Sequence, residues 1–148
     1  MTGVQTCALP ISASTSAGHP PPLLLRQGHE TREVEAGGLP IGIDPGACYT
    51  HAELWLQPED TLLLYSDGLM DCENHHGQQY GLEAVRKRAE GHTGSDLVKL
   101  LSQLEDDFDE WRSGTPLSDD LSLLLLNFNP DNAKMSHETG DLRLCQSS

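Results

Sequence analysis

The stretch TLLLYSDGLMD, residues 61–71, decides the fold more than any other part of this sequence. Its first half is almost continuously apolar and rich in strand-forming residues, which predicts a strand buried on both faces. The strand ends at Asp67-Gly68. A carboxylate beside a buried strand costs free energy unless another group compensates its charge. Asp67 is therefore a candidate functional residue.

A second acidic motif precedes another apolar run, in SDDLSLLLLNF at residues 118–128. The run 121–128 predicts a final buried strand, and Asp119 and Asp120 stand directly before it. Arg112 is the only basic residue close to them in sequence. Two interpretations stay open from spacing alone. The aspartates hold a divalent cation through hard oxygen ligands, Mg²⁺ or Mn²⁺, or they form a turn and an Asx-type cap.

The rest of the chain predicts strands first and helices later. We expect a hairpin of two short strands joined through 27–30, then a Gly/Pro-rich loop. An alternating strand over 48–57 follows, with Tyr49, Leu54 and Leu56 among its inward positions. Helical periodicity covers 82–89 and a longer segment from an N-cap at Ser95 to Trp111, whose apolar stripe includes Val98.

Composition limits the classes of function. The chain has 148 residues, enough for one domain, and 9 Lys+Arg against 23 Asp+Glu give a formal net charge of -14. Such a surface repels phosphate backbones, so we expect no nucleic-acid partner. No apolar run reaches the roughly 20 residues of a transmembrane helix. Four scattered cysteines without disulfide or zinc spacing favour a reduced, cytoplasmic location.

The two ends differ from the middle. MTGVQTCALPI, residues 1–11, resembles the translation of a common sequencing-library adapter, and we expect it to be an artefact fused to a gene fragment. We assign residues 12–129 to the domain itself. The segment 130–148 is polar and without periodicity, which predicts a disordered tail. On this interpretation the gene continues upstream and the chain is its C-terminal part.

Residues 17–128 resemble the C-terminal part of the metal-dependent protein phosphatase family (the PPM or 2C type), most of all its bacterial SpoIIE-like branch. The resemblance is carried, in order, by AGHPPPLLLR (17–26), GGLPIGI (37–43), LQPEDTLLLYSDGLMD (56–71), YGLEAV (80–85) and SDDLSLLLL (118–126). It implies an α+β fold, a partial αββα sandwich of two stacked antiparallel β-sheets flanked by helices, with the N-terminal strands missing.

The resemblance also implies an activity. Members of the family hydrolyse phosphoserine or phosphothreonine in proteins with a water molecule activated between two Mn²⁺ or Mg²⁺ ions. In bacterial signalling the implied substrate is a phosphoprotein such as an anti-sigma-factor antagonist. Carried over position by position, Asp67 and Asp119 match metal ligands, and Asp71 matches an acidic position that helps a further metal in some relatives. Gly68 matches a tight backbone turn, and Asp120 sets the turn or supports Asp119.

One family motif has no match. The first metal motif, D-x-x-G-x-G/H, would lie upstream of Ser12, where the adapter-like segment stands. Truncation of the gene explains both the missing motif and the adapter-like segment. It predicts an incomplete two-metal site and little activity in this chain alone. The main alternative is a non-catalytic pseudophosphatase that binds a partner without the bridging Asp. A structural fragment with acidic turns is a further alternative.

Overall fold

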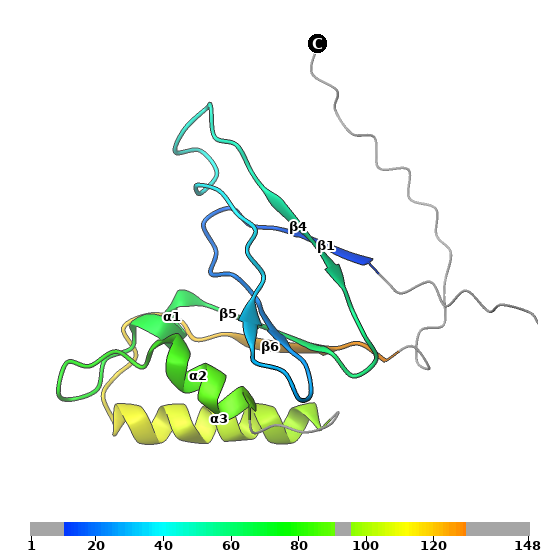
Figure 1. The fold of residues 1–148 in the computed structure, drawn as a ribbon. Coiled ribbons are helices and arrows are strands. Elements are labelled where there is room, and N and C mark those ends of the chain that lie inside the picture. Colours follow the sequence, from blue (N-terminus) through cyan, green and yellow to red (C-terminus); the bar gives the residue numbers. More distant parts are fainter. Residues whose placement is uncertain (1–10, 91–95, 130–148) are drawn as a thin grey trace, which may run out of the picture.

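The computed structural model describes residues 11–90 and 96–129. Its elements run in the order β1 (Ile11–Thr15), β2 (Leu23–Leu25), β3 (Arg32–Glu33), β4 (His51–Trp55), β5 (Thr61–Tyr65), α1 (Asp67–Asp71), α2 (Gly81–Glu90), α3 (Leu97–Arg112) and β6 (Leu123–Asn127) (Figure 1). Strands precede helices, as the sequence predicts, and β6 follows the last described helix.

The strands form two antiparallel sheets. The larger has the order β3-β2-β5-β6, and the smaller pairs β1 with β4. β5 is central because its apolar residues pair on both sides: Leu63 lies opposite Leu23 of β2 and opposite Leu125 of β6. Tyr65 lies opposite Leu123. The end of β5 and the start of β6 therefore lie at the same end of the sheet, and so do the acidic motifs that follow and precede them.

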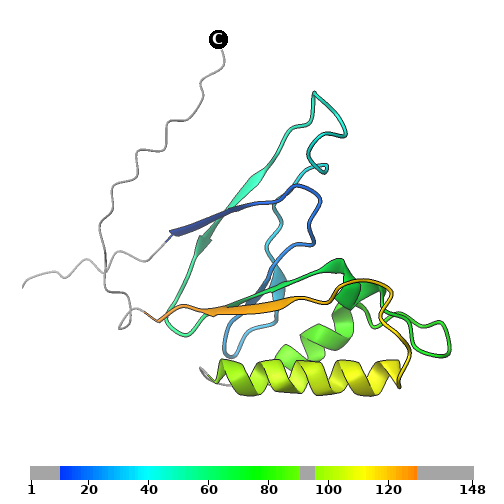
Figure 2. The same cartoon turned by 180° about the vertical axis from the view of Figure 1, so that it is seen from behind.

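Helices α2 and α3 cover one face of the larger sheet (Figures 1 and 2). Alternate residues of the central strands, together with the apolar stripes of the helices, form the main core. Its fully buried members include Leu23, Leu63, Val85, Leu100, Leu104 and Phe108. The predicted helices are confirmed, since their apolar positions recur every three or four residues and face this sheet.

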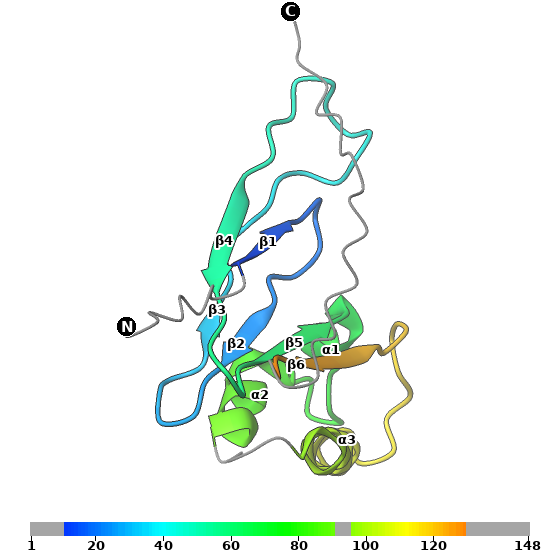
Figure 3. The same cartoon turned by 90° about the vertical axis from the view of Figure 1, so that its right-hand side faces the viewer.

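The smaller sheet lies over the opposite face of the larger one, as Figure 3 shows. Leu54 of β4 packs there with Leu24 of β2 and with Val34. Leu62 of β5 is partly buried and packs against this cluster. Both faces of β5 thus contact apolar residues. The helix-facing side is fully buried, whereas Leu62 and Leu64 are only half-buried.

β6 corrects a prediction. The sequence predicts a buried strand, but Leu124 is 52% exposed and Leu126 is 49% exposed. β6 is the edge strand of its sheet, and the second core is built on β2 and β5. Only the helix-facing residues of β6, Leu123 and Leu125, pack into a core.

Smaller details also differ from the sequence analysis. The N-cap of α3 is Asp96, whose Oδ1 accepts a hydrogen bond from Lys99 N at 3.0 Å; Ser95 lies outside the described residues. Val98 is 77% exposed and Tyr49 is 43% exposed, so neither is a core position.

β1 begins at Ile11, the last residue of the adapter-like segment. The predictions for 1–10 and 130–148 also fall outside the described residues. No described helix has the length and apolar character to span a membrane.

A buried ion pair holds the turn between β4 and β5 against β2. The Nε and Nη2 of Arg26 donate to the two carboxylate oxygens of Asp60 at 2.8 and 2.6 Å, and Nη2 also donates to the Trp55 carbonyl at 3.1 Å. Asp60 is 2% exposed. This hydrogen-bonded partner raises the pKa of Arg26. Neither residue is singled out by the sequence.

Candidate metal centre

The ladder between β5 and β6 continues into the two acidic motifs. Ser66, the residue after β5, donates from its main-chain N to the carbonyl of Ser122 at 3.0 Å. The segment 119–122 therefore runs alongside the residues that lead into α1. Asp67 and Asp119, which are 52 positions apart in sequence, lie on neighbouring segments because of this pairing.

The hydroxyl of Ser66 fastens these segments together. It donates to the carbonyl of Asp120 at 2.8 Å and accepts a hydrogen bond from the N of Ser122 at 2.9 Å. Ser66 is not among the residues that the sequence pattern singles out. The available signal was a hydroxyl residue standing at the end of an apolar strand, immediately before the candidate ligand.

Gly68 allows the close approach of the late motif. A Cβ at this position would lie 2.5 Å from the carbonyl oxygen of Asp120 and 3.3 Å from that of Asp119. A distance of 2.5 Å to a main-chain atom excludes any side chain without a shift of the backbone. Gly68 itself is buried and lies in the first turn of a helix.

Asp67 begins the five-residue helix α1, where the sequence predicts only the end of a strand. Its carboxylate Oδ1 accepts a hydrogen bond from the N of Gly68 at 3.1 Å. Asp71 is the last residue of α1, one turn further along, where positions i and i+4 share a helix face. The Oδ1 of Asp71 accepts a hydrogen bond from Nε2 of Gln79 at 3.5 Å.

The carboxylates of the late motif face water. Asp119 and Asp120 are both exposed. The Oδ1 of Asp119 accepts a hydrogen bond from the N of Asp120 at 2.7 Å. Asp120 contributes its main-chain carbonyl to the contact with Ser66.

No described cation neutralises these groups. Arg112, the nearest basic residue in sequence, donates from Nε to Oδ1 of Asp109 at 2.7 Å and from Nη1 to the Thr115 carbonyl at 3.1 Å. The ion pairs found over 11–90 and 96–129 do not include Asp67, Asp119 or Asp120. Exposed carboxylates without cationic partners suit a hard divalent ion. Within the same residues, however, no three His, Cys, Asp or Glu side chains gather as a ligand group.

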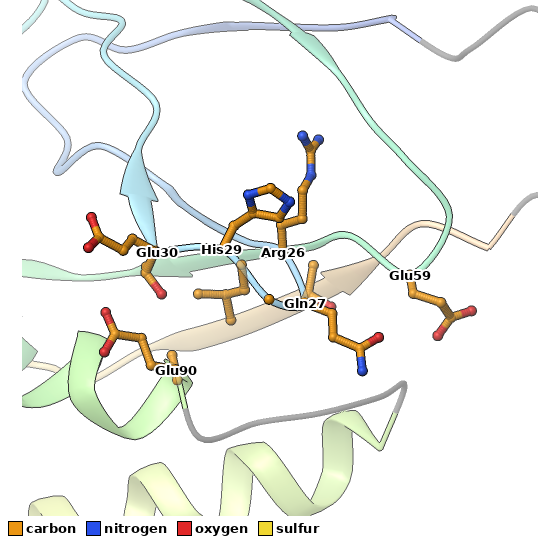
Figure 4. A pocket seen from close by; sticks show the side chains of 11 residues that line it. Arg26, Gln27, His29, Glu30, Glu59 and Glu90 are labelled. Carbon is orange, nitrogen blue, oxygen red and sulfur yellow. The ribbon is translucent and has the colours of Figure 1, made fainter.

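A cavity of the described residues lies elsewhere. It has a volume of about 330 Å³ and opens beside the turn between β2 and β3, next to Thr61 and the end of α2. Figure 4 shows its side chains, with Glu59 on the other side of the opening from Glu30 and Glu90. Thr61 begins β5 and Asp67 follows its end, so the cavity and the acidic motifs are at opposite ends of that strand.

Comparison with known proteins shows similarity over most of the chain. Residues 12–129 match the family described as Stage II sporulation protein E (SpoIIE). Over 112 residues the chain is 29% identical to the phosphoserine phosphatase RsbU of Bacillus subtilis (strain 168). The alignment covers 75% of this chain and 33% of RsbU. The chain therefore spans about a third of that curated relative.

Solved structures show the same fold. The SiaA-PP2C domain of Pseudomonas aeruginosa has a TM-score of 0.67 at 22% identity, covering 77% of this chain and 45% of that domain. The phosphatase domain of SpoIIE from Bacillus subtilis, presoaked with Mn, has a TM-score of 0.57 at 24% identity, with 76% and 48% covered. The structure of the RsbU and RsbW domains of Rv1364c from Mycobacterium tuberculosis has a TM-score of 0.57 at 27% identity. The match covers 81% of this chain and 34% of that structure. The predicted α+β fold, a partial sandwich of two antiparallel sheets with helices, is thus confirmed.

Proposed function

The chain belongs to the SpoIIE family of PPM-type, metal-dependent protein serine/threonine phosphatases, and from this premise we propose that it forms the C-terminal part of a domain that hydrolyses phosphoserine or phosphothreonine in a protein substrate. The observation that carries the proposal is the pair of hydrogen bonds between the Ser66 hydroxyl and the segment 119–122. It holds two carboxylates on adjacent segments without a described cation beside them.

Asp67 and Asp119 are the proposed ligands for Mn²⁺ or Mg²⁺, with Asp71 as a further acidic ligand. Their oxygen donors have the hardness that these ions prefer. When bound, a pair of such cations activates a water molecule and stabilises the charge on the phosphoryl oxygens. Gly68 and Asp120 place the late motif against α1 through the main chain. Because no three potential metal ligands gather among the described residues, we expect weak metal binding and little turnover.

The substrate class follows from the relatives. RsbU is named a phosphoserine phosphatase, and a solved neighbour joins an RsbU domain to an RsbW domain. We therefore propose that the whole protein acts in bacterial signalling, in the cytoplasm, on a phosphoprotein of the anti-sigma-factor antagonist kind. A net charge of -14 fits a protein substrate and disfavours a nucleic acid.

A second candidate function is a pseudophosphatase that binds a phosphoprotein without hydrolysing it. The observation that favours it is the lack, among the described residues, of a group of three potential metal ligands. In that case the acidic motifs would serve the fold, and phosphopeptide binding would be independent of metal.

Titration of the chain with Mn²⁺, followed by calorimetry, tests the assignment. Asp67→Asn and Asp119→Asn should each weaken Mn²⁺ binding by about tenfold or more, since each removes a charged ligand. Asp109→Asn is the matched control, because Asp109 is also exposed but pairs with Arg112. Equal Mn²⁺ affinity in all four proteins would show that the carboxylates are not ligands. Binding of a phosphoserine peptide that ignores both Mn²⁺ and the two variants would favour the pseudophosphatase.

A further inference from the structure

The turn between β1 and β2 carries an exposed histidine, His19. We propose that His19 is a further substrate-binding residue, whose Nε2 donates a hydrogen bond to a phosphoryl oxygen of the phosphoprotein. This role rests on the proposed function, because it adds a contact beside the candidate metal ligands. Two features support it: the bonds that fix the imidazole ring, and the place of the turn in the fold.

The main chain of the turn is fixed on both sides of His19. The hydroxyl of Ser16 donates to the His19 carbonyl at 2.8 Å and accepts a hydrogen bond from the His19 N at 3.1 Å. Gly18 has a φ of +82°, a conformation that favours glycine. A Cβ on Gly18 would lie 2.5 Å from Cγ of Pro40, so the turn packs closely against the loop between β3 and β4. The backbone therefore gives His19 a defined position.

The imidazole ring of His19 is also fixed. Its Nδ1 lies 2.9 Å from the carbonyl oxygen of Pro20. A carbonyl oxygen only accepts hydrogen bonds, so Nδ1 carries a proton and donates it. This bond sets the orientation of the ring and leaves Nε2 to meet a ligand. Within 11–90 and 96–129, Nε2 of His19 has no hydrogen-bond partner.

The pairing of β2 with β5 brings the turn to the end of the sheet that carries the acidic motifs. Leu23, the first residue of β2, lies opposite Leu63 in an antiparallel pair. The start of β2 is therefore near the end of β5, which Asp67 follows, and Asp119 lies on the segment beside it. Figures 1 and 3 both show the turn on the same side of the molecule as α1.

The chemistry of a phosphoryl group explains why a nitrogen at this place is useful. A dianionic phosphoryl group offers only hydrogen-bond acceptors, and ionised carboxylates cannot donate to it. The imidazolium form of His19 can donate, because both of its ring nitrogens carry protons. In this form Nδ1 keeps its bond to Pro20 while Nε2 bonds to the phosphoryl oxygen. The negative charge of the phosphoryl group favours this form. The contact would therefore distinguish phosphoserine from serine.

Calorimetric titration with a phosphoserine peptide, and with the same peptide carrying serine, tests this role in the presence of Mg²⁺. The parent chain should prefer the phosphoserine peptide. His19→Asn keeps an amide near the Nδ1 position but has no donor at the Nε2 position, so it should weaken phosphoserine binding by about tenfold. His19→Gln places its amide nitrogen near the Nε2 position and should restore part of the affinity. His29→Asn is the matched control, because His29 is an exposed turn residue beyond the other end of β2.

The outcomes separate this role from the proposed function. A parent chain that binds both peptides alike would overturn the two together. A parent chain that prefers the phosphoserine peptide, with unchanged affinity in His19→Asn, would overturn the role of His19 alone.

Nitrogen-15 NMR of the imidazole rings gives a second measurement on the unaltered chain, again with Mg²⁺. The Nε2 signal of His19 should shift when the phosphoserine peptide is added and should stay in place with the serine peptide. The Nε2 signal of His29 should stay in place with both peptides. An Nε2 signal of His19 that does not move while the phosphoserine peptide binds would also overturn the proposal, because it would limit His19 to fixing the turn.

Discussion

The hydroxyl of Ser66 and the main-chain carbonyl of Asp120 form a hydrogen bond of 2.8 Å between segments 54 residues apart in sequence. The same hydroxyl accepts a hydrogen bond from the N of Ser122 at 2.9 Å. One side chain at the end of β5 therefore holds the loop that carries Asp119. Ser66 precedes the candidate ligand Asp67 and contacts Asp120, the neighbour of the candidate ligand Asp119. Ser66 is not itself a proposed ligand.

Ser66→Ala tests whether the contact positions the loop. The substitution leaves the Asp120 carbonyl and the Ser122 amide without this partner, which should lower the free energy of unfolding by about 1–2 kcal/mol. If Asp67 and Asp119 bind metal together, Mn²⁺ affinity should also fall. Urea unfolding and Mn²⁺ titration measure the two effects. Ser102→Ala, on the exposed side of α3, is the control and should change neither. A loss of stability with unchanged metal affinity would limit Ser66 to a role in the fold.

Gly68→Ala should damage the same junction more severely. The added Cβ would lie 2.5 Å from the Asp120 carbonyl oxygen, and main-chain atoms cannot move aside as a flexible side chain can. Overpacking of this kind costs about 1–3 kcal/mol. Thermal unfolding should show the loss. Gly46→Ala provides a comparison, because a Cβ at Gly46 meets only Oδ1 of Asp44 at 3.5 Å, an ordinary contact. Equal stability of the two variants would contradict the close approach seen at Gly68.

Local sequence patterns predicted most of the elements correctly. The hairpin of β2 and β3, the strand β5 and the helices α2 and α3 each carry their own periodicity or turn signal, which needs no knowledge of the distant chain. The motif at Asp67-Gly68 also stood out locally, because a carboxylate directly follows an apolar strand. The family resemblance then supplied the two-sheet arrangement, which no single segment encodes.

The features that the sequence did not reveal depend on distant segments. Whether Leu124 is buried depends on β6 lying at the sheet edge, and strand order is not written in the strand itself. Asp60 becomes a buried ion-pair partner only because β2 brings Arg26 beside it. Ser66 gained its role from a loop that follows α3. These are consequences of tertiary pairing, and a period or spacing rule cannot predict them.

The buried pair between Arg26 and Asp60 leads to a prediction on stability. Asp60→Asn keeps the shape of the side chain but leaves the guanidinium without its counter-charge in a largely buried place. Removing one partner of a buried pair costs about 3–5 kcal/mol, and because Arg26 is 20% exposed we expect the lower end of this range. Asp109→Asn, which breaks the surface pair with Arg112, should cost less than about 1 kcal/mol. Urea denaturation of both variants decides the matter, and a cost below 1 kcal/mol for Asp60→Asn would contradict this account.

Two tyrosines of the main core predict how the fold responds to alkaline pH. Burial raises the pKa of both Tyr65 and Tyr80. The ring of Tyr80 packs edge-on against Phe108 and Trp111, with ring centroids 5.2 and 5.9 Å away, and its hydroxyl has no hydrogen-bond partner among the described residues. Charging this oxygen would therefore place an anion in an apolar site.

The sign of the effect follows from proton binding. An unfolded tyrosine loses its proton near pH 10, whereas folded Tyr80 holds its proton to a higher pH. Above about pH 10 the folded state thus binds more protons than the unfolded chain, and stability must fall as pH rises. Tyr80→Phe cannot ionise, so its loss of stability above pH 10 should be shallower. At pH 7 the variant should be as stable as the parent or up to about 1 kcal/mol more stable, because it removes a buried hydroxyl without a partner. Urea unfolding at pH 7, 9 and 11 measures both effects, with Tyr49→Phe as the exposed control. Identical alkaline slopes for the parent and Tyr80→Phe would show that this phenol does not couple to folding.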